Sequence, residues 1–301
     1  MTSISAATLE TDFTDRLAAV REAIDQRLAQ LLPEAGNERD LVAMAMRDST
    51  LAPGKRVRPI LLVLAANGLG NGTAQAVDLG CAVEMIHAAS LVLDDMPCMD
   101  NALLRRGRQT VHVRFGEDVA ILTAVALLSR AFGVVATIRD LRPEVRTQLV
   151  EILANTVGMK GLVCGQLKDL RDGTQARSAE EIALTNELKT GVLFGAVMDM
   201  AWLISDAPDS VRPALQGFAV ELGQAFQLYD DLQDDSLDTA KDPGKDEGKS
   251  TLVALYGREK VRERLHAHLS KADRCLQEVY GGDQAISGFV AAIFARAASL
   301  S

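Results

Sequence analysis

Apolar residues recur every three or four positions along most of the chain, which is the spacing of one face of a helix. This pattern predicts helices at 41–46, 60–69, from about 74 to 94, and at 119–135, 143–169, 178–204 and 211–235. The part from 251 onward is also expected to be helical. An earlier predicted helix ends at Pro33 and carries Phe13, Leu17, Val20, Ile24, Leu28 and Leu31. Since no segment alternates like a strand, we expect one all-α domain spanning residues 1–301.

Breakers and caps set the helix ends. Pro53 and Gly54 end one helix, and Pro59 suits the first turn of the next. Ser178-Ala-Glu-Glu181 is a capping box that opens a later helix. Pro97 is expected to break the helix that begins near residue 74. On an unbroken helix Asp100 would lie about 240° around from Asp94, so a turn here is needed to bring the two acids together.

Acidic and basic residues crowd together after that helix. Asp94, Asp95 and Asp100 follow an apolar run and precede Arg105, Arg106 and Arg108. An ionised carboxylate beside buried apolar residues loses its water shell, and a bound cation can replace that shell. We therefore interpret the three acids as candidate metal ligands.

A second acidic cluster lies in the segment FQLYDDLQDD, at 226–235. On a helix its first and last candidate ligands, four residues apart, differ by only about 40° and share a side. The cluster contains Asp230, Asp231 and Asp234. Two acidic clusters, each at the end of an apolar helix, predict two faces around divalent ions.

Composition narrows the possible partners and compartment. The net charge of −9 disfavours nucleic acid. Four cysteines without a CxxC or zinc-like spacing indicate a reduced, intracellular set. The N-terminus does not resemble a signal peptide, and the longest apolar run, 119–128, is shorter than the ~18 residues of a transmembrane helix. We expect a cytoplasmic protein with no transmembrane segment.

The chemistry of these residues points to diphosphates. Aspartates without nearby His or Cys favour Mg²⁺ or Mn²⁺ over zinc. Arginine forks and lysines bind phosphate oxygens directly. The candidate phosphate donors are Lys55, Arg58, Arg105 and Arg106. With apolar helices between the clusters, the residues alone predict Mg²⁺-dependent diphosphate chemistry on an apolar substrate.

Five motifs in order resemble those of the trans-isoprenyl diphosphate synthases, most closely the bacterial geranylgeranyl and farnesyl enzymes. They are GKRVRP at 54–59, the helix EMIHAASLVLDDMPCMD at 84–100, RRG at 105–107, the pair Lys189-Thr190, and FQLYDDLQD followed by GKST at 248–251. The resemblance implies a bundle of about ten or more helices around a central cavity (the isoprenoid synthase fold) and a homodimer. It also implies head-to-tail condensation of isopentenyl diphosphate with an allylic diphosphate, namely dimethylallyl, geranyl or farnesyl diphosphate.

The resemblance also implies residue roles. The two aspartate clusters together would hold three Mg²⁺ ions on the allylic diphosphate, and Mn²⁺ is expected to substitute for Mg²⁺. The same diphosphate would be contacted by Arg105, Lys241 and Lys249. Isopentenyl diphosphate would lie on Lys55, Arg58, His87 and Arg106. The ionising carbon would be lined by Lys189, Thr190 and Gln227. Gln166 and Asp169 fit the GQxxD segment of the family.

Product length is expected to depend on residues just before the first acidic motif. Ala89 and Ser90 stand five and four residues before Asp94, and farnesyl enzymes of similar type tend to carry an aromatic at the position of Ala89. A methyl group leaves room for further isoprene units, and the insertion of Pro97 and Cys98 also fits the geranylgeranyl type. We therefore expect geranylgeranyl diphosphate, a precursor of carotenoids or similar terpenoids. Asn101, where relatives often carry Asp, departs from the pattern.

Other interpretations compete with this one. An aspartate pair at a helix end is often a solvated cap, RRGR alone is often a solvated charge run, and His87 and Ala89 alone suit ordinary core residues. Farnesyl diphosphate synthesis, a terpene cyclase, a noncatalytic partner subunit and a purely structural bundle are the alternative functions. The cyclase needs no second diphosphate site, and noncatalytic subunits tend to lose an aspartate motif. A purely structural bundle would not explain the paired acidic and basic clusters.

Overall fold

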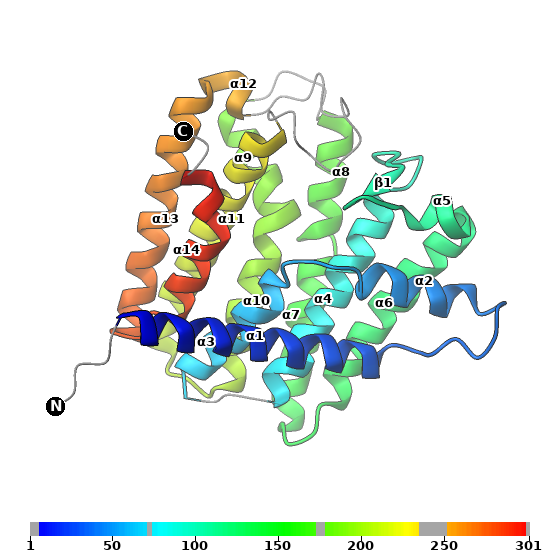
Figure 1. Ribbon diagram of the computed structural model, residues 1–301, viewed down its shortest axis with the longest axis horizontal. Coiled ribbons are helices and arrows are strands. Elements are labelled where there is room, and N and C mark those ends of the chain that lie inside the picture. The colour runs from blue at the N-terminus through cyan, green and yellow to red at the C-terminus, as the bar shows by residue number, and fades with distance from the viewer. Residues whose placement is uncertain (1–5, 71–73, 173–177, 235–251, 299–301) are drawn as a thin grey trace.

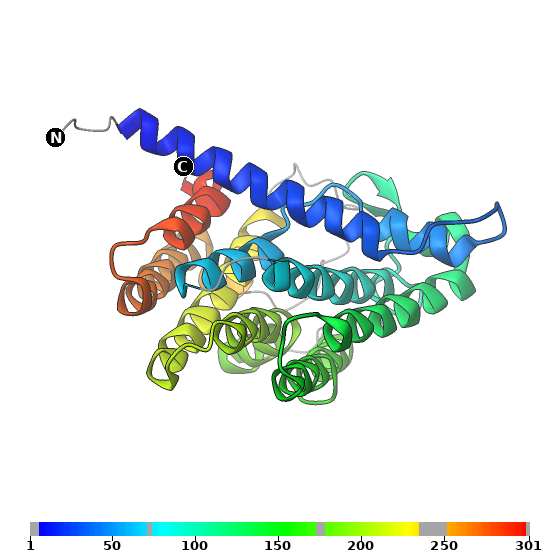
Figure 2. The same cartoon turned by 90° about the horizontal axis from the view of Figure 1, so that it is seen from below.

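The computed structural model describes residues 6–70, 74–172, 178–234 and 252–298. Its helices run roughly side by side, except that α1 crosses one face of the bundle (Figures 1 and 2). The first half contains α1 (Ala6–Leu31), α2 (Leu41–Thr50), α3 (Val57–Gly68), α4 (Ala74–Asp94), α5 (Val111–Phe115), α6 (Glu117–Thr137) and α7 (Pro143–Val157). The second half contains α8 (Leu162–Asp172), α9 (Ala179–Asn186), the π-helix η1 (Glu187–Gly191), α10 (Val192–Ile204), the 3₁₀ turn η2 (Asp209–Val211), α11 (Arg212–Asp234), α12 (Leu252–Tyr256), α13 (Arg258–Tyr280) and α14 (Ala285–Ala298). The predicted all-α fold is confirmed.

The strongest sequence signals are reproduced. Helix α1 ends two residues before Pro33, and its Ile24 and Leu28 are fully buried. Helix α4 begins at Ala74 as expected. The capping box at α9 is present, because the Glu181 amide donates to Ser178 Oγ at 3.2 Å and the Ser178 amide donates to Glu181 Oε2 at 2.8 Å.

Two predicted helices are divided in the structure. The helix expected at 143–169 is α7 followed by α8, separated at Gly158–Gly161, where the Gly161 amide donates to the Gly158 carbonyl at 3.0 Å. The helix expected at 178–204 contains the π-helix η1 between α9 and α10. A π-helix within an α-helix is uncommon and often marks a functional site. Here it contains Lys189 and Thr190.

The expectation of no strand was wrong at one place. Strands β1 (Leu104–Arg105) and β2 (Arg108–Gln109) pair antiparallel, with Arg105 opposite Arg108. The turn between them needs positive φ angles, which Arg106 (+52°) and Gly107 (+74°) adopt. Glycine takes this conformation at little cost. The hairpin fixes the direction of the arginines after α4.

Helix α4 lies inside the bundle and packs against α3 and α6. By length and composition, α4 and α6 are each long and apolar enough to cross a membrane, at 21 residues. This corrects the expectation that no segment of the chain reaches that length. Core helices of folded domains meet the same criterion, and 67% of the apolar stretch of α4 is buried within the bundle. The length of these helices does not by itself indicate a membrane span.

Candidate active site

The chain turns back on itself directly after α4. The Asp100 amide donates to the Asp94 carbonyl at 2.9 Å, and the Asn101 amide donates to the Met96 carbonyl at 2.9 Å. Asn101 has a φ of +49°, a conformation that asparagine tolerates better than most residues. The expected turn therefore exists, and it returns Asp100 to the neighbourhood of Asp94.

The pKa of Asp94 is raised to about 6, mainly because burial disfavours the charged carboxylate. The positive charge of Lys189 opposes this shift, and the negative charge of Asp100 adds to it. Neighbouring partly buried carboxylates are stabilised by a cation. The electrostatics of this turn therefore suit a metal ion.

Arg105 forms a two-pronged ion pair with Asp95. Its Nε lies 2.8 and 2.9 Å from the two carboxylate oxygens, and its Nη2 lies 2.6 Å from Oδ1. Burial raises the pKa of Asp95 even though Arg105 opposes that shift. Burial also acts to lower the pKa of Arg105, but Asp95 outweighs it and the pKa is raised. The contacts fix the guanidinium and the carboxylate in one mutual orientation.

Arg58, Arg106 and His87 of α4 form a cationic group, in which both arginines act electrostatically on the imidazole. The Arg58 guanidinium lies 4.8 Å from the ring centroid of Phe194, and its Nε is buried without a hydrogen-bond partner among the described residues. The pKa of Arg58 is lowered by burial and by the charge of Arg106. The pKa of His87 is lowered well below its ordinary value, first by burial and then by Arg58 and Arg106. This group is a neutral imidazole among guanidiniums, which suits an anion.

Arg106 reaches the loop before α3. Its Nη1 donates to the Pro53 carbonyl at 3.1 Å. A Cβ on Gly54 would lie 2.5 Å from that same Nη1, so only glycine leaves room for this guanidinium. Lys55, next along, is exposed, and its Nζ lies 5.4 Å from the ring centroid of Tyr229. The 53–58 segment thus meets both the hairpin and α11.

The π-helix η1 presents Lys189 toward α8 and the first acidic turn. Lys189 Nζ lies 2.7 Å from Asp169 Oδ2. Burial acts to lower the pKa of Lys189, but Asp94 and Asp169 outweigh it and the pKa is raised. A Cβ on Gly165 would lie 2.5 Å from the backbone nitrogen of Lys189, so glycine allows α8 to approach η1. Thr190 follows and is partly buried.

The neighbouring Gln166 has an unsatisfied amide. Both its Oε1 and its Nε2 are buried without a hydrogen-bond partner among the described residues. A buried amide without partners is costly, and a bound polar group would satisfy it.

The second acidic cluster is partly committed to local structure. Asp231 is buried and accepts from Gln227 Nε2 at 2.8 Å and from the Leu252 amide at 3.3 Å. Asp230 is exposed, and its charge acts on Arg58. The structure therefore links α11 to the cationic group of α4. The side chain of Asp234, and the predicted Lys241 and Lys249, lie outside the described residues.

The two predicted length-determining residues differ in their surroundings. Ala89 is fully buried. Ser90 is partly buried, and its Oγ donates to the His87 carbonyl at 2.9 Å, within α4.

Across the described residues, no three His, Cys, Asp or Glu side chains form a ready-made metal site. Mg²⁺ usually keeps several waters and takes one or two carboxylates together with phosphate oxygens. The acids after α4 fit that mode of binding, in which the diphosphate supplies the remaining ligands.

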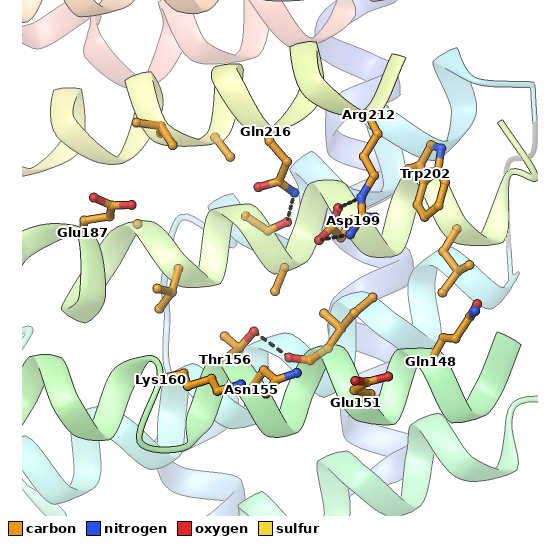
Figure 3. Close-up of a pocket in the computed structure, with 18 residues that line it drawn as sticks. Gln148, Glu151, Asn155, Thr156, Lys160, Glu187, Asp199, Trp202, Arg212 and Gln216 are labelled. Atoms are coloured by element: carbon orange, nitrogen blue, oxygen red, sulfur yellow. Dashed lines mark hydrogen bonds and ion pairs between the residues drawn. The ribbon is translucent and has the colours of Figure 1, made fainter. Parts of the chain in front are cut away.

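A cavity of about 560 Å³ lies between α7, α10 and α11 (Figure 3). Glu187 and Gly191 line it, whereas none of the predicted catalytic, metal or diphosphate residues is among its described lining. Arg212 donates to both oxygens of Asp199 at 2.8 and 3.1 Å, and Glu151, Lys160 and Glu187 also line the cavity.

Sequence reasoning had not assigned a role to Arg56 or Glu84. Arg56 is buried between Asp25 and Glu84. The available signal was a single acid, Glu84, within the apolar run of α4, three residues before His87.

Acidic turns and clustered arginines on an all-α bundle define a class of helical enzymes that act on diphosphates. The family model described as polyprenyl synthetase matches residues 39–284. The chain therefore belongs to the polyprenyl synthetase family, whose members join prenyl units head to tail.

Two curated bacterial relatives cover most of the chain. The chain is 54% identical to the geranylgeranyl diphosphate synthase of Pantoea ananas over 90% of each protein. It is 50% identical to that of Pseudescherichia vulneris, over 86% of this chain and 85% of the relative. A solved apo structure of an FPP/GFPP synthase from Zymomonas mobilis has a TM-score of 0.82 at 32% identity, covering 93% and 96% of the two chains. These relatives support a prenyltransferase of the short-chain trans type.

Proposed function

We propose that the chain condenses isopentenyl diphosphate with an allylic diphosphate and releases geranylgeranyl diphosphate. The observation that carries this proposal is that two separate polar groups lie along α4. One is the acidic turn at its C-terminal end, with Arg105. The other is the cationic group of Arg58, His87 and Arg106, in which Arg58 Nε has no hydrogen-bond partner among the described residues. Two sites of this kind suit two diphosphates.

The acidic turn would hold the allylic diphosphate together with Mg²⁺. Asp94, Asp95 and Asp100 would supply metal ligands, and Arg105 would bind phosphate oxygens. Bound Mg²⁺ would stabilise the charge that develops on the departing diphosphate. Asp230, Asp231 and Asp234 would complete the metal site, with three ions in all, and Mn²⁺ would substitute for Mg²⁺. Lys241 and Lys249 would contact the same diphosphate.

The cationic group would hold isopentenyl diphosphate. Arg58 and Arg106 would bind its oxygens, and His87 would donate as a neutral imidazole. Lys55 would add a fourth donor. Because no carboxylate of the acidic turn pairs with these side chains in the described contacts, the second diphosphate can bind without a metal bridge.

The reaction would take place between the two groups. The allylic C–O bond breaks and its electron pair leaves with the diphosphate, the double bond of isopentenyl diphosphate forms the new C–C bond, and a proton is lost. Lys189, held by Asp169, would lie beside the departing diphosphate, and Thr190 and Gln227 would line the ionising carbon. Preorganised cations of this kind stabilise developing negative charge without rearranging.

The small residues Ala89 and Ser90 support a longer product. The methyl group of Ala89 would permit a longer prenyl chain than an aromatic ring at this position. Farnesyl diphosphate is the alternative product, and the relative from Zymomonas mobilis carries that activity in its name.

We also propose that the chain is a cytoplasmic, single-domain protein that forms a homodimer. Helix α8 exposes apolar side chains, since Val163 and Leu167 are each 48% exposed, whereas the side-chain amide atoms of Gln166 are buried. Helix α6 exposes Ile121, Leu122 and Val125 on its outer face. A second copy of the chain would cover such apolar faces.

Product analysis tests the function. The purified chain, with Mg²⁺ and isopentenyl diphosphate, is incubated with farnesyl diphosphate or with dimethylallyl diphosphate, and the dephosphorylated alcohols are separated. Geranylgeraniol from both starters is expected. Farnesol as the end product from the shorter starter would favour the farnesyl alternative. No elongation with either starter would favour a noncatalytic subunit, and a cyclised hydrocarbon would favour a terpene cyclase.

A further inference from the structure

Arg56 is a buried arginine in an unusual backbone conformation. Its φ and ψ are +49° and +37°, in the left-handed region that favours glycine. Its side chain is only 4% exposed. A turn required only for its backbone would be served better by glycine, so the side chain at this position has a role of its own.

The Arg56 side chain joins α3 to α1 and α4. Its Nε lies 2.8 Å from Asp25 Oδ1 and its Nη1 lies 2.9 Å from Glu84 Oε1. Glu84 is also buried, with its side chain 8% exposed. A guanidinium between two carboxylates fixes both direction and distance, which a single contact would not do.

The neighbours of Arg56 point to other elements. Lys55 lies over Tyr229 of α11, and Arg58 lies over Phe194 of α10. Arg56 therefore stands in the sequence between two cations that contact α11 and α10. Any rotation of the loop about Arg56 would move both of them.

Glu84 is the carboxylate shared by this cationic group. It pairs with Arg56, and its negative charge acts on both Arg58 and Arg106. It also lies one helical turn before His87 on α4, so a single helix carries both groups.

We propose that Arg56 and Glu84 are positioning residues that hold Lys55, Arg58 and Arg106 in the geometry that binds the diphosphate of the homoallylic substrate. This inference rests on the proposed function, because it assigns that substrate to the cationic group. Neither residue needs to touch the substrate. Their effect is on the orientation of the cations that do.

The test compares Michaelis constants in the full-length enzyme. Arg56→Gly removes the side chain and relieves the left-handed backbone, so a loss in this variant cannot come from backbone strain. It is expected to raise the KM for isopentenyl diphosphate about tenfold or more, because small displacements of binding groups are costly. The KM for the allylic substrate should change much less.

Arg27→Met is the matched control. Arg27 also joins α1 to α4 through an ion pair, with its Nε 2.6 Å from Asp78 Oδ1, but its side chain is 38% exposed. Its partner Asp78 lies six residues before Glu84 on α4. This variant should leave the KM for isopentenyl diphosphate unchanged. An equal rise in both variants would show that any α1–α4 ion pair matters, and would overturn the proposal.

Glu84→Gln keeps the shape of the side chain and an oxygen acceptor. It therefore tests the proposal independently if the Arg56→Gly variant misfolds. A positioning role predicts a rise in the KM for isopentenyl diphosphate of about threefold or more, because a neutral amide holds Arg56 less firmly. A fall in this KM would mean that Glu84 only opposes the substrate charge, and would overturn the proposal. If wild-type protein consumes no isopentenyl diphosphate, the proposed function itself fails, which is a distinct result.

Discussion

Arg105 contacts Asp95 through three hydrogen bonds of 2.6 to 2.9 Å. Both side chains belong to groups that we assign to one substrate, the allylic diphosphate and its metal ions. When that substrate binds, the guanidinium can donate to a phosphate oxygen as well as to the Asp95 carboxylate. The pair therefore keeps Arg105 oriented before binding.

Replacing this guanidinium by an ammonium tests its fork. Arg105→Lys keeps the charge and loses the bidentate geometry, so we expect the KM for the allylic diphosphate to rise about tenfold. Steady-state kinetics with farnesyl diphosphate as the varied substrate measures it. Arg108→Lys is the control, since Arg108 pairs with Asp48 instead. Equal effects in both variants would argue against a specific contact.

Removing one carboxylate from the first acidic turn should remove turnover and keep the fold. For Asp94→Ala we expect kcat to fall about 100-fold or more, because metal-held diphosphate is the leaving group. Circular dichroism should show unchanged helix content. Asp199→Ala, which removes a carboxylate paired with Arg212, should retain activity. Full activity in Asp94→Ala would refute the metal role.

The raised pKa of Asp94 predicts a pH dependence of stability in metal-free protein. Between its ordinary pKa of 3.8 and about 6, Asp94 is protonated in the folded chain and ionised in the unfolded chain. The folded state is therefore favoured in acid, and this contribution is lost as pH rises through about 6. The difference corresponds to at most about 3 kcal/mol.

Urea unfolding with a chelator present checks this sign. Asp94→Asn should raise the free energy of unfolding at pH 7.5 and have a smaller effect at pH 4. A variant that is less stable than wild type at pH 7.5 would contradict the burial argument.

A larger side chain at Ala89 should shorten the product. Ala89 is fully buried, so Ala89→Phe inserts a ring into packed space at a cost of about 1–3 kcal/mol. We expect farnesol to replace geranylgeraniol after dephosphorylation. Ala88→Phe, also buried but about 100° around α4, is the control for overpacking. An unchanged product in Ala89→Phe alone would remove this residue as the length determinant.

Chelation tests the metal directly. Removing divalent ions should stop condensation, and Mg²⁺ should restore it, because acidic groups this close need a cation to hold a diphosphate. Mn²⁺ is expected to restore it in part. Turnover that persists in the chelator would overturn the mechanism.

Local signals in the sequence determined most of the helices and predicted the candidate site residues. The spacing of apolar residues predicted α1, α4, α6 and α11, because a helix face is set by residues three and four apart. The capping box at Ser178 and the turn after α4 were also predicted, since caps and proline act on their immediate neighbours. The metal and diphosphate residues were named from their types and order.

Only the tertiary structure decided how distant segments meet. The division of α9 and α10 by η1 accompanies the close approach of Gly165 to Lys189, a contact between residues 24 positions apart that local periodicity cannot encode. The inward direction of Arg56 depends on Asp25 and Glu84, which lie on two other helices. Asp231 accepts a hydrogen bond from the Leu252 amide, which is another contact between residues distant in the sequence. Residue types and their spacing predict the candidate reacting groups, whereas long-range packing sets which of those groups face each other.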